Sequence, residues 1–163
     1  MVAARIPAFL REIGIPVEAA SLAHAETFLP GIRLERGALL VDDAKLAYPG
    51  DLLHEAGHVA MTPPELRSHL SGDVEVPGLD MTSLEVAAIA WSYAAAVALG
   101  LDAAAVFHAA GYRGHSPGLL ATFRAGVDPG AHLLEEAELT ATGPRAEALG
   151  VEPYPHMLRW LRG

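Results

Sequence analysis

The spacing of apolar and polar residues predicts helices over most of the chain. Apolar positions recur at helical spacing over residues 2–13, where Gly14 ends the pattern. Residues 16–26 predict a second, short helix. An alanine-rich segment that begins at residue 80 or 82 and runs to residue 99 predicts a long helix closed by a glycine. Further helices are predicted over residues 102–110, 116–125, 129–139 and 155–161, with a short one around Arg145 and Glu147.

Between these helices the apolar period changes to two, which is typical of strands. Residues 32–36 alternate apolar and charged side chains, Gly37 interrupts them, and residues 38–41 and 45–48 form two further short runs. The pattern predicts a small antiparallel sheet of two or three strands, one face of which covers the next helix. Its edge strand offers a place for an extended peptide, unless a loop covers that edge. The predicted fold class is therefore α+β, mostly helical.

The segment that follows this sheet carries the most specific chemistry. Residues 48–61 predict one short helix: a Pro-Gly turn and Asp51, a plausible N-cap, precede it, and Pro63-Pro64 stops it. His54 and His58 are four residues apart, so both imidazoles project from one face of this helix. Both can direct a nitrogen at a point about 2 Å away, which is the Zn–N distance. The pair is predicted to bind zinc.

Glu55 completes the H-E-x-x-H pattern of zinc hydrolases. It lies about 100° around the helix from His54, where it can reach a water on the metal without becoming a ligand. This is the position that a general base needs. The alternative is an amphipathic helix that carries two surface histidines and a glutamate. Its apolar neighbours argue against that, since histidines beside a buried surface need partners.

A catalytic zinc site needs a third protein ligand, and Glu85 fits best. It follows His58 by 27 residues and lies in the first turn of the predicted long helix, whose dipole favours a carboxylate. Ser92 and Tyr93 fall two turns later on nearly the same side. The alternative role for Glu85 is a capping box with Thr82. Substitute ligands in the preceding loop are His69, Asp73 and Glu75.

The amino-acid composition further limits the metal ligands and the partners that the chain can have. The chain has no cysteine, so a metal must use histidine or carboxylate ligands, which fits a reducing cytoplasm. A net charge of −9 without a basic stripe argues against a nucleic-acid partner. The longest apolar run, residues 86–101, is too short to span a bilayer, and no signal peptide is expected. We expect one domain over residues 1–163 and no membrane partner; no feature sets an oligomeric state.

The segments His54-Glu-Ala-Gly-His58 and Glu85-Val-Ala-Ala-Ile-Ala resemble the zincin-like metallopeptidases of the gluzincin type, closest to the ImmA/IrrE family. The resemblance covers roughly residues 30–100. It implies a zincin-like domain in which an active-site helix packs on a second, ligand-bearing helix, with Zn²⁺ on His54, His58 and Glu85 and with Glu55 as base. The chain departs from the family in two ways: no helix-turn-helix accompanies the domain, and the helical part from about residue 101 is unmatched.

Together these features predict a zinc metallopeptidase that hydrolyses a peptide or protein substrate. The oxyanion formed in that reaction needs a donor, for which we favour Tyr93 and His115. Other candidates in the same region are His108, Tyr112 and Arg113. The alternative function is a zinc-binding regulatory or interaction protein that keeps the fold without turnover, and a third is a protease that is silent until a partner activates it.

Overall fold

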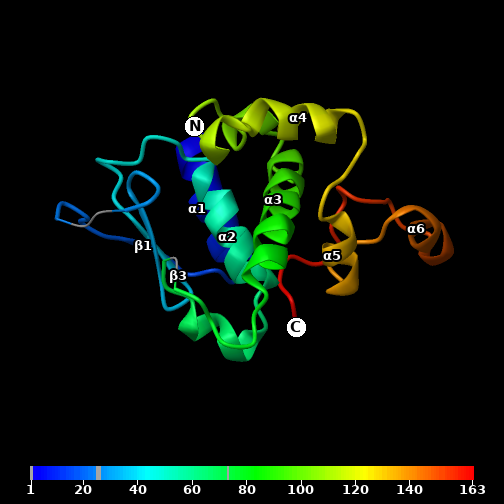
Figure 1. Ribbon diagram of the computed structural model, residues 1–163, viewed down its shortest axis with the longest axis horizontal. Helices are drawn as coiled ribbons and strands as arrows, with labels where there is room; N and C mark the ends of the chain where they lie inside the picture. Colours follow the sequence, from blue (N-terminus) through cyan, green and yellow to red (C-terminus); the bar gives the residue numbers. More distant parts are fainter. Residues whose placement is uncertain (1, 25–26, 73) are drawn as a thin grey trace.

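Two helices lie side by side at the centre of the α+β fold, α2 (Asp51–Met61) and α3 (Met81–Ala98) (Figure 1). They make the most extensive contact between any two elements. The computed structural model describes residues 2–24, 27–72 and 74–163, and about 46% of the chain is helical. The other helices are α1 (Val2–Glu12), α4 (Ser116–Arg124), α5 (Ala131–Glu136) and α6 (Gly143–Leu149), with 3-10 turns η1 (Pro64–His69), η2 (Ala103–Ala105) and η3 (Tyr112–Gly114).

The sheet has three short strands, β1 (Val17–Ala19), β2 (Ile32–Glu35) and β3 (Ala38–Val41), in the order β1-β3-β2. The antiparallel pairing of β2 with β3 was predicted correctly. The all-antiparallel sheet was wrong, because β1 pairs in parallel with β3 and makes the sheet mixed. The predicted helix over residues 16–26 is also wrong in its described part, and residues 25–26 lie outside the described residues. Strand β1 could not be predicted from its own residues, because three residues are too few to show a period. It is defined by its pairing with β3.

The third strand predicted over residues 45–48 is a turn instead. The amides of Lys45 and Leu46 both donate to the Asp42 carbonyl, each at 2.9 Å, which turns the chain away from the sheet. Helix α2 then begins at Asp51, with Gly50 rather than Asp51 as its N-cap, and ends before Thr62. The helix therefore begins three residues after the start of the predicted segment 48–61, one residue before the start that Asp51 as N-cap implies, and ends at Met61 as predicted.

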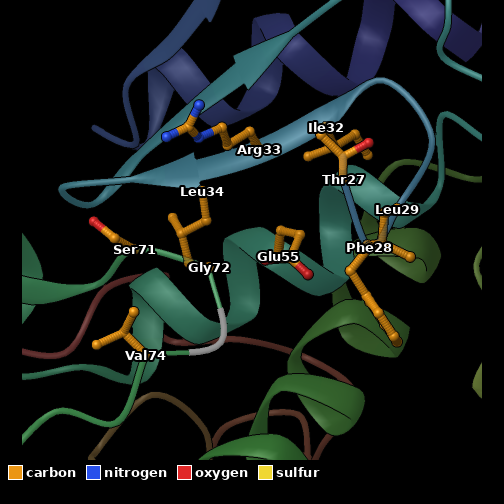
Figure 2. A pocket seen from close by; sticks show the side chains of 10 residues that line it. All are labelled: Thr27, Phe28, Leu29, Ile32, Arg33, Leu34, Glu55, Ser71, Gly72 and Val74. Atoms are coloured by element: carbon orange, nitrogen blue, oxygen red, sulfur yellow. The ribbon is translucent and has the colours of Figure 1, made fainter. Parts of the chain in front are cut away.

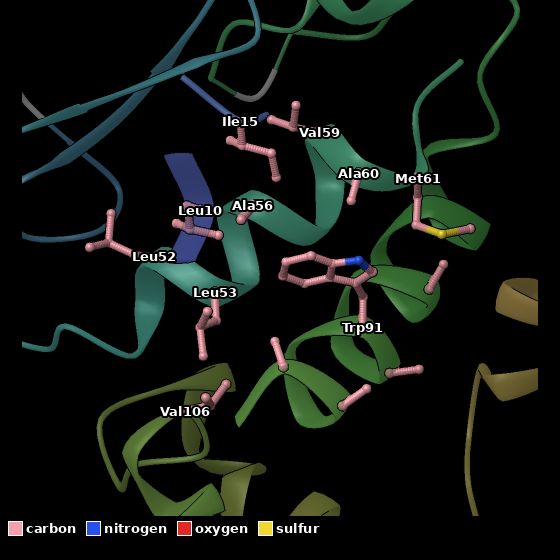
Figure 3. Close-up of a cluster of buried hydrophobic side chains, with 14 of the residues drawn as sticks. Leu10, Ile15, Leu52, Leu53, Ala56, Val59, Ala60, Met61, Trp91 and Val106 are labelled. Carbon is pink, nitrogen blue, oxygen red and sulfur yellow. The ribbon is translucent and has the colours of Figure 1, made fainter. Parts of the chain in front are cut away.

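The core is centred on Trp91, which is fully buried on α3 (Figure 3). The indole faces α2, where Leu53 and Ala56 are also fully buried, and Leu10 of α1 lies behind them. Nine residues of α3 are buried, which explains its nearly uniform apolar sequence. By length and composition this helix would suffice to cross a membrane; half of it is buried inside the fold, and a buried core helix passes the same test.

The C-terminal third contains fewer helical residues than expected. The predicted helix over residues 102–110 is a single 3-10 turn, that over 129–139 is shorter, and residues 155–161 are not helical. The last segment runs instead across the ends of the central helices. The Arg162 amide donates to the Ala60 carbonyl at 2.9 Å, and the Trp91 indole N–H donates to the Trp160 carbonyl at 3.0 Å. These hydrogen bonds to residues distant in the sequence hold the last segment in place, and a local sequence pattern does not predict them.

The distance between α2 and α3 is set by a glycine. Gly57 lies between His54 and His58 on α2, and a Cβ added there would lie 2.9 Å from both the Cα and the carbonyl oxygen of Ala88. Ala88 is one turn beyond Glu85 on α3. Because no side chain separates the two backbones at this point, Glu85 comes within reach of the two histidines.

We predict that Gly57→Ala destabilises the protein by about 1–3 kcal/mol, because overpacking outweighs the gain of about 1 kcal/mol in helix propensity. Gly118→Ala is the matched control, since Gly118 also lies in a helix, α4, and has open space at its Cβ position. Chemical denaturation measures both. A Gly57→Ala variant as stable as the Gly118→Ala variant would show that the close contact does not set the helix spacing.

Candidate metal centre

Two histidines of α2 converge on one point, as their spacing predicts. The Nε2 atoms of His54 and His58 lie 3.1 Å apart, with the two rings at 88° to each other. Only 13% and 14% of their side chains are exposed. A neutral imidazole carries a proton on one ring nitrogen and a lone pair on the other, so the two facing Nε2 atoms attract each other only with a proton on one of them or a cation between them.

Glu85 reaches the same point from α3. Its Oε1 lies 3.4 Å from the Nε2 of His54, and its Oε2 lies 3.1 Å from the Nε2 of His58. The ligand atoms of the three residues lie within 4.8 Å of one another, and the set can hold a metal ion. Two ligands at the Zn–N distance and the tetrahedral angle are about 3.3 Å apart. The closest separations, 3.1 and 3.4 Å, lie near that value, with one oxygen of Glu85 facing each histidine, so the donor set suits a zinc ion.

The capping-box role considered for Glu85 is wrong. Helix α3 is capped by Asp80, whose carboxylate accepts from the amides of Thr82 at 3.1 Å and Ser83 at 3.3 Å. The Ser83 hydroxyl donates to the same carboxylate at 2.7 Å. The amides of Thr82 and Ser83 at the start of α3 thus have a hydrogen-bond acceptor without Glu85. The Glu85 side chain turns toward α2 instead.

The charges of this site depend on each other. Burial alone would raise the pKa of Glu85, but its hydrogen bonds with His54 and His58 outweigh burial and hold that pKa far below the ordinary 4.5. Burial would lower the pKa of His54, yet the hydrogen bond and charge of Glu85 raise it above the ordinary 6.5. In the metal-free protein a proton therefore occupies part of the place that fits a cation.

Glu55 lies next to the site and faces a cavity of about 390 Å³ (Figure 2). Its charge contributes to the raised pKa of His54, which places the carboxylate within electrostatic reach of the ligands. Strand β2 forms one wall of the cavity, and Phe28 and Val74 stand at its rim with 76% and 61% of their surfaces exposed. The cavity therefore combines one acidic group with partly apolar, partly polar walls, and Glu55 links it to the triad, whose residues do not line it.

A tyrosine from a distant loop contacts the far side of the first histidine. The Tyr112 hydroxyl lies 2.9 Å from the Nδ1 of His54, and the two rings meet edge to face. Tyr112 and Arg113 both have left-handed backbones, with φ of 51° and 52°, a conformation that costs a non-glycine residue about 1–3 kcal/mol. Burial raises the pKa of Tyr112 well above its ordinary value, so the phenol keeps its proton.

A buried hydrogen bond between His108 and Asp51 holds this loop against the start of α2. The Nε2 of His108 lies 2.7 Å from the Oδ1 of Asp51, and the Tyr48 ring stacks on the imidazole at 3.8 Å. Burial raises the pKa of Asp51, and the hydrogen bond and charge of His108 oppose that rise. A Cβ at Gly50 would lie 1.9 Å from the Ala105 carbonyl oxygen, so loop and helix are in backbone contact here. Sequence analysis named His108 only as a candidate oxyanion donor in the polar segment 107–115 and did not predict its contact with Asp51.

The favoured oxyanion donors are placed away from the triad. The Tyr93 ring stacks on Phe123 at 4.4 Å, and eight residues, about 12 Å of helix, separate it from Glu85. His115 is exposed at the start of α4. Among the hydrogen bonds and ion pairs of the described residues, none joins either side chain to the triad. Of the substitute ligands, His69 and Glu75 are exposed, and Asp73 lies outside the described residues.

In the comparisons with known proteins, no family model, curated protein or solved structure matches this chain.

We predict that the His54–Glu85 pair stabilises the metal-free protein in a defined pH window. The lowered pKa of Glu85 makes its contribution present above about pH 4.5 and lost as pH falls through its folded pKa. The raised pKa of His54 makes its contribution present below about pH 6.5 and lost as pH rises through its folded pKa. The difference in unfolding free energy between wild type and Glu85→Gln should therefore be largest between these two values.

Urea denaturation in the presence of a chelator, repeated from pH 4 to pH 9, measures this difference. Glu75→Gln serves as the control, because Glu75 is exposed and on the neighbouring loop. A difference between wild type and Glu85→Gln that stays constant from pH 5 to pH 9 would contradict the coupling.

Proposed function

We propose that this chain is a zinc-dependent metallopeptidase of the zincin type. The observation that carries the proposal is the convergence of His54, His58 and Glu85 on one point, with Glu55 on the adjacent position of the same helix. The closest separations between their ligand atoms, 3.1 and 3.4 Å, are near those of tetrahedral zinc, and three protein ligands would leave a fourth position for water. A bound zinc would supply a Lewis acid that lowers the pKa of a water and polarises a carbonyl. The resemblance of the two ligand segments to gluzincins agrees with this reading.

Glu55 is the residue proposed to move protons. Its carboxylate lies beside the ligands and opens to the cavity, so it can accept a proton from a water there and later deliver it to the leaving amine. The partial exposure of the Glu85 side chain, 47%, leaves this side of the site accessible to a substrate. A structural zinc site needs neither a proton acceptor like Glu55 nor a partly exposed ligand like Glu85. The presence of both favours catalysis over the purely regulatory alternative.

The proposed substrate is an extended peptide lying along β2. Gly72 donates to the Leu34 carbonyl at 2.9 Å, so the backbone of Leu34 points away from β3. By the alternation of an antiparallel ladder, the Leu34 N–H and the Ile32 carbonyl point to the same edge. Gly72 covers the Leu34 carbonyl, and the Leu29 carbonyl accepts from the Ile32 amide at 3.1 Å at the other end. The Ile32 carbonyl and the Leu34 N–H between them are the groups proposed to bind the peptide, beside the cavity that Glu55 lines (Figure 2).

Removal of Glu55 or Glu85 should separate binding from turnover. We predict that Glu55→Gln keeps one zinc per chain and loses peptidase turnover by about 10²–10⁴-fold, since only the base is missing. Glu85→Ala should lose zinc. Zinc at about 1,000 times its Kd should raise the Tm of wild type by about 10 °C, and Glu85→Ala should lack most of that shift. Metal analysis, a fluorogenic peptide library and thermal unfolding measure the three quantities.

The outcomes separate the candidate functions. Zinc in wild type without turnover of any peptide favours the regulatory zinc-binding protein. Equal zinc content in wild type and Glu85→Ala would place the third ligand elsewhere. Glu65→Ala is the control, because Glu65 is exposed in η1 and its loss should leave zinc content and Tm shift as in wild type.

Phe28 should determine which peptides bind. An apolar substrate side chain would lie between Phe28 and Val74, so Phe28→Ala should raise KM for peptides with a large apolar residue about fivefold to tenfold and leave kcat unchanged. Leu149→Ala is the control, since Leu149 is similarly exposed but lies on α6, at the opposite end of the molecule (Figure 1). An unchanged KM in Phe28→Ala would contradict substrate binding in this cavity.

A further inference from the structure

We propose that residues 160–162, which we call the strap, hold the turn of α2 that carries His58 in the geometry that binds metal. Arg67 and Arg162 are the positioning residues of this arrangement. The inference rests on the metal site of the proposed function and assigns roles to residues outside that site. The strap lies against the C-terminal end of α2 and against α3 (Figure 1).

The last turn of α2 cannot bond all of its carbonyls through the chain that follows. A helical carbonyl normally accepts from the amide four residues later, and the last four carbonyls of a helix lack that partner. Here Pro63-Pro64 follows directly after the helix, and proline has no amide proton. Ala60 and Met61 are both buried, so their carbonyls need donors from elsewhere in the protein.

The strap supplies both donors and also binds α3. The Arg162 amide donates to the Ala60 carbonyl at 2.9 Å, and its Nη1 donates to the Met61 carbonyl at 3.4 Å. Two residues earlier, the Trp160 carbonyl accepts from the Trp91 indole N–H at 3.0 Å. Because α2 and α3 carry the three candidate ligands, one short segment holds both parts of the metal site.

Arg67 of η1 completes the cap of α2. Its Nε donates to the carbonyls of Val59 at 3.2 Å and Thr62 at 3.1 Å. Its Nη2 donates to the Arg162 carbonyl, so the two arginines are also bonded to each other. The carbonyls of residues 59–62 thus all accept from one of these two arginines.

The capped turn is the one that places His58. The His58 carbonyl accepts from the Thr62 hydroxyl at 2.7 Å, so both residues belong to the last turn. The Nε2 of His58 lies 3.1 Å from the Oε2 of Glu85 and 3.1 Å from the Nε2 of His54. If this turn frays, His58 moves away from both, whereas His54 lies one turn further into the helix and keeps its place. Loss of the cap therefore weakens metal binding through His58.

Zinc affinity of the full chain, measured by competition with a chelator, tests this coupling. Arg67→Ala should weaken zinc binding about tenfold, a usual size for coupling between two sites. Arg162→Ala should weaken it by less, because the Arg162 amide remains. Arg159→Ala is the matched control, since Arg159 directly precedes the strap but donates to the Ala137 carbonyl, at 3.3 Å.

Hydrogen exchange distinguishes a positioning role from a general loss of stability. In the metal-free protein, the amides of residues 58–61 should exchange about tenfold faster in Arg67→Ala, while those of residues 55–57 keep their wild-type rates. Coupling is reciprocal, so zinc should slow exchange of the Arg162 amide in wild type. Arg67→Lys should not restore zinc affinity, because an ammonium lacks the planar set of donors that reaches three carbonyls.

The outcomes separate this inference from the proposed function. If wild type binds zinc and Arg67→Ala binds it as tightly as Arg159→Ala, the strap plays no part and the metallopeptidase proposal stands. Faster exchange along the whole of α2, or wild-type zinc affinity in Arg67→Lys, also overturns the strap. If wild type itself binds no zinc, both the inference and the proposed function are wrong. Should Arg67→Ala fail to fold, Arg162→Ala against Arg159→Ala gives the same decision.

Discussion

Where α2 crosses α3, the backbones of Gly57 and Ala88 come so close that a single methyl group would not fit between them. Everything at the candidate metal centre follows from this spacing. The two histidines flank the glycine on one helix, and Glu85 lies one turn from the alanine on the other. Helical geometry alone brings the histidines together, but only the close crossing brings the carboxylate to them. The alanines of α3 contribute for the same reason, since small side chains let the large Trp91 ring pack between the helices.

The site is also electrostatically incomplete without a cation. Two nearly buried imidazoles and a carboxylate converge on a common centre. Against the opposing effect of burial, Glu85 raises the pKa of His54, and the two histidines lower the pKa of Glu85. A divalent ion would satisfy all three groups at once, which is how proteins usually stabilise such a set. Around this centre a second set of bonds, through Tyr112 and through Asp51 with His108, ties α2 to a loop from the C-terminal half.

The sequence predicted what is local and missed what is formed between distant segments. Helix α2 was found because a Pro-Gly turn and a Pro-Pro stop delimit it, and its two histidines follow from the spacing. Glu85 was predicted as the third ligand because it lies in the first turn of the predicted long helix. Strand β1 was missed because it exists only by pairing with β3. Tyr112 was named only as a candidate oxyanion donor, and its contact with His54 was not predicted, because no periodicity links a loop tyrosine to a histidine 58 residues earlier.

The most direct test of the central claim is X-ray absorption spectroscopy at the zinc edge on the zinc-loaded protein. The account predicts four-coordinate zinc with two imidazole nitrogens at about 2.0 Å and oxygen ligands from a carboxylate and a water. Glu85→Gln should change the oxygen shell while both imidazoles remain. A spectrum with fewer than two imidazoles, or one that is identical in wild type and Glu85→Gln, would show that the two helices do not form this metal centre.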